Sequence, residues 1–459
     1  MGSSSASRAA RPSPDVAPAR ACAYRVIRRV FERGAFADRA LQAEARALER
    51  RDRALATALA YGTVQRRATL DHVLTLLCSR PLQRLDPPLL AALRLGLYQL
   101  LYLDGVAEHA AVDDAVKLAK RETRAGAQLV NAVLRRAVRE GRALVAALDD
   151  ETPAQAAIAH SAPAWLAELW FAELGPTRAR SLLAAINRPA EAALRVNTLR
   201  LQPPALRAAL PVQARPAGPE LPEGLVLGEP FDAHGSELFA RGAIMPQARA
   251  SMLVGRLLDP KSGERVLDLC AAPGAKTTHL AALMEAHGEL VAVERHPGRA
   301  AALERTCARM GAANVRVLVA DAERLLAGAF ALAPGSFDRV LLDPPCSGLG
   351  TLQSRPDLRW RMSAERMVRL AALQARLLAL AAELTAPGGT LVYSVCTISA
   401  REGERVIESL LERRPEFEVD DLRALHPRWG SERGGPHLQL LPDRDGTDGF
   451  FIARLRRVR

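Results

Sequence analysis

Two cysteines are the most reactive side chains of this sequence, and each follows an apolar run. Cys346 lies in the stretch DPPCSG and Cys396 lies in YSVCT, 50 residues further on. A thiol at such a position can act as a nucleophile when nearby cations or a helix N-terminus lower its pKa from about 8.5. Metal binding is the alternative chemistry for two cysteines, but no histidine lies near either one in the sequence to complete a site. The pair therefore predicts thiolate chemistry.

A second set of residues predicts a slot for an adenosine-like ligand. The stretch DLCAAPGAKT, residues 268–277, places small residues after a strand and before a helix, so its backbone can approach a ligand and offer free N–H groups. It matches neither the GxxxxGK phosphate loop nor the GxGxxG dinucleotide fingerprint. Glu294 and Asp321 end the next two apolar runs. Carboxylates at these positions could accept hydrogen bonds from ribose hydroxyls and from an adenine amino group.

The two cysteines and the residues of the expected slot can act together only if they lie at one edge of a β-sheet. Alternating strands and helices in residues 238–459 would form such a sheet. Apolar runs typical of buried parallel strands are separated by amphipathic helices, and they cover residues 265–269, 290–294, 315–320, 339–343 and 390–395. A hairpin of residues 437–441 with 450–455 would add an antiparallel strand. We expect a doubly wound α/β fold, in which ligands bind at the carboxyl ends of the strands.

The rest of the chain divides into three expected parts. Residues 1–18 are rich in Ser, Pro, Ala and Arg and are expected to form a disordered tail. Residues 19–140 show only helical periodicity, which predicts an all-helical domain. Residues 141–237 combine a helical stretch over 163–186 with a short strand and many prolines, which predicts a small α+β subdomain.

Positive charge is concentrated in the expected helical domain. The whole chain of 459 residues has 63 Lys and Arg against 51 Asp and Glu, and residues 19–140 alone have 22 against 13, a net charge of +9. This concentration suggests a module that binds a polyanion such as nucleic acid, although a solvated arginine-rich surface would have the same composition. The six cysteines are too sparse for a disulfide scaffold. With no signal peptide and no long apolar run, we expect a cytoplasmic protein without a membrane partner.

Several motifs resemble those of the RNA (cytosine-5)-methyltransferases. They are VLDLCAAPGAKTTHL, DPPCSGLGT, YSVCTI and the closing stretch DGFFIAR, and HSAPAWLAELW and ALRVNTLR are similar to upstream elements of that family. RDRALATALAYGTV and AVDDAVKLAK resemble the NusB-type RNA-binding fold. This pairing is similar to the bacterial Sun/Fmu-type 16S ribosomal RNA methyltransferases, and the resemblance covers nearly the whole chain after residue 18.

The resemblance implies a fold, an activity and roles for particular residues. It implies a NusB-like helical domain, a small α+β subdomain and a class I S-adenosylmethionine-dependent methyltransferase domain that methylates C5 of a cytosine in 16S rRNA, at conventional position 967. Cys396 would attack C6 of the base and Cys346 would assist release. Asp343 would hydrogen-bond the cytosine edge and Lys276 would orient the base or lower a thiol pKa. The implied cofactor slot comprises Cys270, Ala271, Ala272, Pro273, Gly274, Ala275, Lys276, Glu294, Asp321 and Asp343.

The sequence departs from the family pattern at a few positions and leaves alternatives open. Ala275 stands where the family usually has a second glycine, Pro344 where it has alanine and Val395 where it has threonine, and Gln353-Ser354 replace residues that are often basic. A transfer RNA methyltransferase shares the same core. An RNA-binding antitermination factor with an inactive core is disfavoured by the intact cysteines, and an amino-methyltransferase is disfavoured by cysteine at 346. We expect 16S rRNA or a small-subunit assembly intermediate as partner, no metal, and a monomer.

Overall fold

The computed structural model describes residues 16–326 and 332–458, and these form two compact units. The first unit contains the chain up to Asn187 together with Arg355–Arg361, and the second contains Arg188–Ser354 and Met362–Arg459. Residues 1–15 of the expected tail lie outside the described residues, and the first helix begins at Pro18. None of the described helices is long and apolar enough to cross a membrane.

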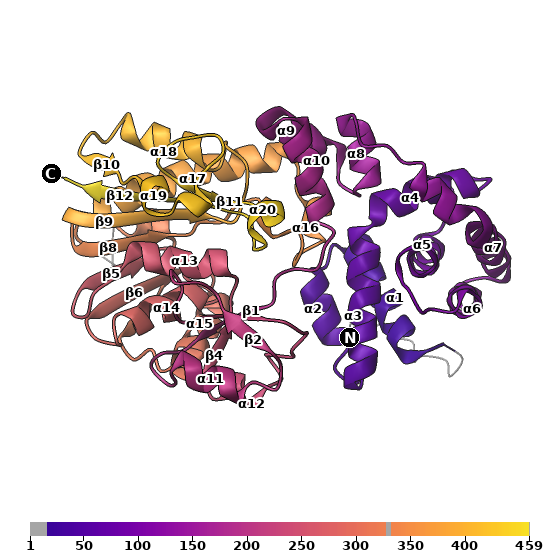
Figure 1. The fold of residues 1–459 in the computed structure, drawn as a ribbon, viewed down its shortest axis with the longest axis horizontal. Coiled ribbons are helices and arrows are strands. Elements are labelled where there is room, and N and C mark those ends of the chain that lie inside the picture. The colour runs from indigo at the N-terminus through magenta and orange to yellow at the C-terminus, as the bar shows by residue number, and fades with distance from the viewer. Residues whose placement is uncertain (1–15, 327–331, 459) are drawn as a thin grey trace, which may run out of the picture. The chain divides into compact units, whose positions relative to one another are not determined.

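The described part of the first unit contains helices and no strand (Figure 1). Apolar side chains from α1 to α7 form a single core cluster. Leu89, Leu93, Leu97 and Leu100 belong to it, as the three- and four-residue spacing along α5 requires. The helices are α1 (Pro18–Arg33), α2 (Ala37–Glu44), α3 (Arg50–Gln65), α4 (Arg67–Leu77), α5 (Pro87–Tyr102), α6 (Glu108–Lys120), α7 (Arg124–Ala146), α8 (Pro153–Ala159), α9 (Ala164–Leu174), α10 (Pro176–Ala185) and α16 (Leu358–Arg361).

Helices α8 to α10 group with this helical unit, whereas the sequence pattern predicted one α+β subdomain over residues 141–237. The physical reason is a set of hydrogen bonds to α3 and α4. Ala68 N donates to Ser161 Oγ at 2.9 Å, and Thr69 Oγ1 donates to the Ile158 carbonyl at 2.6 Å. The Gln65 amide also donates to the carbonyl of Ile186 at 2.8 Å.

The segment Arg355–Arg361 belongs to the helical unit although the chain on either side of it belongs to the second unit. Arg359 is fully buried, and its guanidinium donates to the carbonyls of Gln65, Ser161 and Ile186 and to Asn187 Oδ1 at 3.0–3.2 Å. The Trp360 indole N–H donates to a carbonyl at the end of α3 at 2.7 Å. This insertion was not predicted from the sequence.

The second unit is built on an eight-stranded mixed sheet, and the expected doubly wound α/β fold is confirmed. The strand order is β10-β12-β9-β8-β5-β6-β7, with β11 paired to β12. Strands β5 to β9 pair in parallel, whereas β10, β11 and β12 run antiparallel to their neighbours. The strands are β5 (Arg265–Asp268), β6 (Glu289–Glu294), β7 (Val315–Val319), β8 (Phe337–Leu342), β9 (Thr385–Val395), β10 (Phe417–Val419), β11 (Leu438–Leu440) and β12 (Phe450–Arg457).

Helices cover both faces of this sheet and form two separate apolar cores. Helices α13 (Arg249–Leu258), α14 (Ala275–Leu283) and α15 (Pro297–Met310) contribute to one core, and α17 (Ala364–Leu384) and α18 (Glu404–Leu411) contribute to the other (Figure 1). The short helices α19 (Leu422–Leu425) and α20 (Pro442–Asp445) precede the last two strands. The order reverses at β5, between β6 and β8, which is where a doubly wound sheet binds its ligand.

A four-stranded antiparallel sheet precedes this fold in the same unit. Its order is β2-β3-β1-β4, and it carries two short helices. The elements are β1 (Ala193–Val196), α11 (Pro203–Ala209), β2 (Ala214–Pro216), β3 (Gly224–Leu227), α12 (Glu237–Ala240) and β4 (Ile244–Pro246). Only one strand was predicted here from the sequence, at residues 193–197.

Candidate active site

Cys346 and Cys396 meet at the carboxyl edge of the central sheet. Strands β8 and β9 are parallel neighbours with Leu342 opposite Tyr393, so the residues that follow both strands emerge at the same edge. The two sulfur atoms are 3.2 Å apart, within hydrogen-bond distance for a thiol and a thiolate. The 50-residue separation in sequence is therefore closed by the pairing of two adjacent strands.

The surroundings of the two sulfurs favour a protonated thiol at one cysteine and a thiolate at the other. The hydrogen bond with Cys396, then burial and the charges of Cys396, Glu402 and Asp343, raise the pKa of Cys346 well above its usual value. Lys276 also interacts electrostatically with Cys396. This arrangement can keep a proton on Cys346 while Cys396 carries the thiolate.

An ion pair of Asp343 and Lys276 lies beside the thiols. Asp343 follows β8, and Lys276 belongs to the first turn of α14. The Lys276 ammonium is 2.7 Å from Asp343 Oδ2, and Ser394 Oγ donates to Asp343 Oδ1 at 2.9 Å. Burial opposes the charge of Lys276, but the neighbouring carboxylate outweighs it and raises the pKa of the amine. Lys276 also lies 5.1 Å from the centre of the Phe450 ring.

The loop between β5 and α14 has the features of a ligand cradle. Gly274 has φ +103°, and a Cβ at this position would lie 2.8 Å from Leu303 Cδ1, so only glycine fits without displacement. Ala275 is the first residue of α14 and is not among the positive-φ residues, so the absent second glycine is not needed. No side chain caps α14, so its first backbone N–H groups have no side-chain acceptor. Asp268 accepts from Thr277 Oγ1 at 2.8 Å.

Acidic side chains end the next two strands along this edge. Glu294, at the end of β6, is almost fully buried; it accepts from His296 N at 2.8 Å and lies 3.3 Å from Arg299 Nε. Asp321 follows β7, accepts from a backbone N–H at 3.2 Å and lies 3.5 Å from Arg295 Nε. Because β5, β6 and β7 are consecutive in the sheet, these carboxylates and the glycine loop line one edge. This donor and acceptor set fits a nucleoside with ribose hydroxyls and an exocyclic amine.

In the other four cysteines burial is the largest cause of a raised pKa, whereas at Cys346 it is the hydrogen bond with Cys396. Burial raises the pKa of Cys22 to about 11 and that of Cys307 to about 12, and it raises the pKa of Cys78 and Cys270 as well. These thiols keep their protons at neutral pH, as side chains used for packing would.

Three residues near the site were missed by sequence reasoning. Arg195 is fully buried and donates to the carbonyl of Ala275 at 3.1 Å and to Thr278 Oγ1 at 2.9 Å, so it holds the first turn of α14. Arg299 donates to the carbonyl of Ala272 at 2.8 Å. Glu402 is fully buried behind the thiol pair. Only Arg195 had a usable signal, since it is a charged residue inside an otherwise apolar strand.

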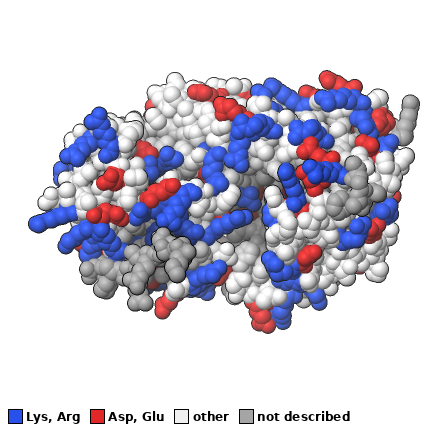
Figure 2. Space-filling view, turned by 180° about the vertical axis from the view of Figure 1, so that it is seen from behind, with Lys and Arg blue, Asp and Glu red and all other residues white. Residues whose placement is uncertain are grey.

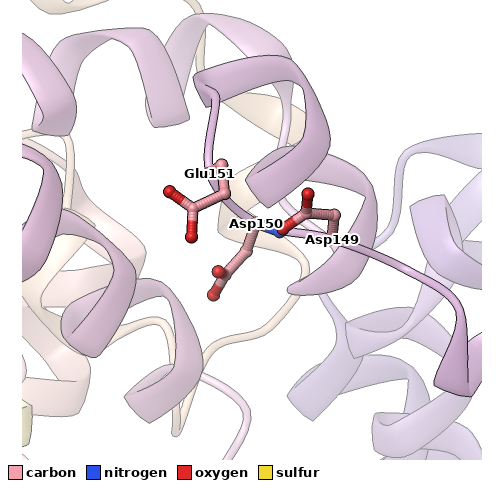
Figure 3. Close-up of side chains that lie close together, drawn as sticks. All are labelled: Asp149, Asp150 and Glu151. Atoms are coloured by element: carbon pink, nitrogen blue, oxygen red, sulfur yellow. The ribbon is translucent and has the colours of Figure 1, made fainter.

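An acidic cluster in the helical unit is not part of this site. The oxygens of Asp149, Asp150 and Glu151 lie within 4.8 Å of one another (Figure 3). Asp150 is 2.8 Å from His160 Nε2, and Glu151 is 2.8 Å from Arg180. These contacts engage two of the three carboxylates with neighbouring side chains of the helical unit.

Comparison with known proteins agrees with this fold. The model of the family "16S rRNA methyltransferase RsmB/F" matches residues 255–456, the NusB family model matches residues 17–139, and an RsmF/B-like ferredoxin-like domain matches residues 162–234. The probable ribosomal RNA small subunit methyltransferase B of Bacillus subtilis is 35% identical over 421 residues, which cover 89% of this chain and 92% of that protein.

Two further similar proteins are also named as methyltransferases. Ribosomal RNA small subunit methyltransferase B of Thermus thermophilus is 37% identical over 409 residues, 89% of each chain. A crystal structure of a methyltransferase homolog protein from Pyrococcus horikoshii has a TM-score of 0.58 at 30% identity, and it covers 66% of this chain and 98% of that one.

The fold and site define an S-adenosylmethionine-dependent RNA methyltransferase with a NusB-like helical domain. Within that class, the chain belongs to the ribosomal RNA small subunit methyltransferase B family.

Proposed function

We propose that this protein methylates C5 of a specific cytosine in 16S rRNA through a covalent bond between Cys396 and C6 of the base. The observation that carries the proposal is the 3.2 Å separation of the Cys346 and Cys396 sulfurs beside the Asp343–Lys276 ion pair. C5 of cytosine is a poor nucleophile, and addition of a thiolate across the 5,6 double bond makes it electron-rich.

In the first half of the reaction, the Cys396 thiolate forms a bond to C6, and the electron pair of the double bond moves to C5. Asp343 accepts a hydrogen bond from the N4 amine of the base, and the Lys276 ammonium beside it stabilises the negative charge that develops at N3. When bound, S-adenosylmethionine supplies the methyl group that C5 takes up. The residues proposed to hold it are Glu294 for the ribose hydroxyls, Asp321 for the adenine amine, Asp343, and the loop from Cys270 to Lys276.

In the second half, Cys346 takes part in release. Bond formation at Cys396 removes the hydrogen bond and the negative charge that raise the pKa of Cys346, so Cys346 loses its proton to water more readily at this stage. The Cys346 thiolate then takes the C5 proton, the 5,6 double bond re-forms, and the C6–sulfur bond breaks with its electron pair returning to Cys396. The proton that Cys346 lost to water balances the reaction.

Substitution of each cysteine tests this assignment. Cys346→Ser should accumulate a covalent protein–RNA adduct that survives denaturing electrophoresis, because attack proceeds and release is blocked. Cys396→Ser should form no adduct. The reverse pattern would exchange the two roles, and the absence of adduct from every variant would refute the covalent mechanism.

We propose further that the helical unit docks the RNA through phosphate contacts. Figure 2 shows Lys and Arg side chains spread over this unit, at the left of the view, with fewer Asp and Glu between them. Exposed arginines lie at and just before the start of α3 and in the second half of α7, and they are Arg46, Arg50, Arg51, Arg135, Arg136 and Arg139. Such contacts position RNA without reading its sequence.

Charge reversal is a sharper test of docking than deletion of residues 19–140, because deletion would also remove Gln65, whose carbonyl accepts a hydrogen bond from the buried Arg359. The double variant Arg50→Glu/Arg51→Glu should weaken RNA binding and lower the slope of log Kd against log salt by roughly one for each phosphate that is no longer neutralised. The exposed pair Arg207→Glu/Arg215→Glu in the second unit changes the net charge equally and serves as control. Equal effects of the two double variants would refute a docking role for the helical unit.

The target RNA is decided by bisulfite mapping of total RNA from a strain that lacks the gene. Loss of one 5-methylcytosine from 16S rRNA is expected. Loss from a transfer RNA instead would replace the proposed substrate but leave the reaction unchanged.

A further inference from the structure

A buried carboxylate lies behind the thiol pair and contacts the loops of both cysteines. Glu402 follows β9 and has no solvent-exposed surface. Its carboxylate accepts hydrogen bonds from Ser347 N at 2.8 Å, from the Ser347 hydroxyl, from Thr397 Oγ1 at 3.1 Å and from Gln374 Nε2 at 3.0 Å. Ionised carboxylates only accept hydrogen bonds and offer about four lone-pair sites, so four donors satisfy this one.

The sequence positions of these donors connect the carboxylate to the reaction. Ser347 directly follows Cys346, and Thr397 directly follows Cys396. The two hydroxyls also contact each other, with their oxygens 2.9 Å apart. The Glu402 side chain therefore fixes the residue after each cysteine. By fixing these two residues it also restrains the backbone that carries each sulfur.

The rest of the environment holds Glu402 itself in place. The Tyr393 hydroxyl donates to the Glu402 carbonyl at 2.6 Å. Gln374 donates to the carbonyl of Pro345 at 2.9 Å as well as to the carboxylate, so it links α17 to the loop of Cys346. Among the described residues, no Lys, Arg or His forms an ion pair with Glu402. A buried charge held only by neutral donors is costly to keep, which argues that it serves the site.

We propose that Glu402 is a positioning residue, which holds the Cys346 and Cys396 loops together so that the two thiols stay at hydrogen-bond distance throughout the methyl-transfer cycle. This inference rests on the proposed covalent reaction. Its chemical contribution is twofold. The hydrogen bonds fix the separation of the sulfurs, and the negative charge keeps the proton on Cys346 until Cys396 has bonded to the base.

The variant Glu402→Gln separates this role from general folding. Glutamine keeps the size of the side chain, but it loses the charge and replaces two acceptor sites with donors that face other donors. Glu404→Gln is the matched control. Glu404 lies two residues further on and pairs with Arg433 at 2.7 Å, whereas the Ser347 and Thr397 hydroxyls donate to Glu402.

Two measurements read the outcome. With substrate RNA, Glu402→Gln should release the adduct roughly tenfold more slowly, because Cys346 is no longer held within reach of the C5 proton. This loss of position, the size of one hydrogen bond to a charged group, outweighs the easier ionisation of Cys346. Adduct should therefore accumulate as in Cys346→Ser. Without RNA, alkylation of Cys346 by iodoacetamide, followed by mass spectrometry between pH 7 and 9, should be faster in Glu402→Gln than in the wild type. Glu404→Gln should match the wild type in both.

The two failures are distinguishable. If Cys346→Ser forms no adduct with any RNA, the proposed function fails, while the alkylation profile still decides whether Glu402 controls the thiols. If Glu402→Gln releases RNA and alkylates at wild-type rates, the positioning role is overturned. Should Glu402→Gln not fold, as judged by circular dichroism, Ser347→Ala and Thr397→Val each remove one donor and keep the charge. They should slow release in the same direction, and wild-type release in both would overturn the proposal.

Discussion

Replacing Arg359 with methionine should loosen the helical unit while the second unit remains protected. Methionine is similarly long but has no N–H groups, so the carbonyls of Gln65 and Ser161 and the side-chain oxygen of Asn187 lose donors that lie at 3.2, 3.0 and 3.1 Å. The Ile186 carbonyl keeps its bond from the Gln65 amide. At about 1 kcal/mol for each buried acceptor left unpaired, the loss is about 3 kcal/mol.

Hydrogen–deuterium exchange measures this loss region by region. A decrease of about 3 kcal/mol in local opening free energy corresponds to roughly 100-fold faster exchange in peptides from α3 and α10. Peptides from β5 and β6 should be unchanged and serve as the internal reference. Arg361→Met is the matched control, because Arg361 donates one exposed hydrogen bond to the Gly34 carbonyl. Exchange in α3 and α10 within threefold of the wild type would refute the assigned role of Arg359.

Three further outcomes follow from the second unit. Gly350→Ala should reduce methylation more than tenfold, because its Cβ would lie 1.9 Å from the Gly449 carbonyl oxygen, whereas Gly298→Ala, with open space around it, should not. Arg299→Met should raise the KM for S-adenosylmethionine several-fold with little effect on kcat, since Arg299 contacts the Ala272 carbonyl and is half exposed. Burial raises the pKa of Asp268 to about 6, so the neutral acid stabilises the fold below about pH 4 and this stability is lost as the pH rises through 6. Urea unfolding should therefore show Asp268→Asn gaining about 3 kcal/mol on the wild type between pH 4 and pH 8.

The strands that position the site could be predicted from sequence because they are apolar, continuous and followed by polar residues. Strand β5 begins at Arg265 as expected, and the parallel strands place Cys346, Cys396, Glu294 and Asp321 at one edge as anticipated. The reason is general, since parallel strands share the direction of their carboxyl ends. Hydrophobic periodicity, together with the shared direction of parallel strands, was sufficient to predict the strands and the edge at which these residues lie.

The missed features depend on contacts that local patterns do not encode. Glu402 lies in a short polar stretch after Cys396, and nothing in that stretch distinguishes a buried carboxylate from a solvated one. Arg359 lies in an arginine-rich stretch that looks exposed, yet it is among the largest fully buried side chains of the protein. Strand β10, with only three residues, is too short to give a periodic signal.

The insertion of residues 355–361 into the helical unit also has a consequence for biosynthesis. The ribosome completes Asn187 well before it reaches Arg355, and the intervening 167 residues belong to the second unit. At about 5–20 residues per second, this delay amounts to roughly 10–30 s. During that interval the carbonyls of Gln65, Ser161 and Ile186 lack the hydrogen bonds that Arg359 later donates. The helical unit is therefore the first to be translated, but its interior is completed only after strands β1 to β8 of the other unit have been synthesised.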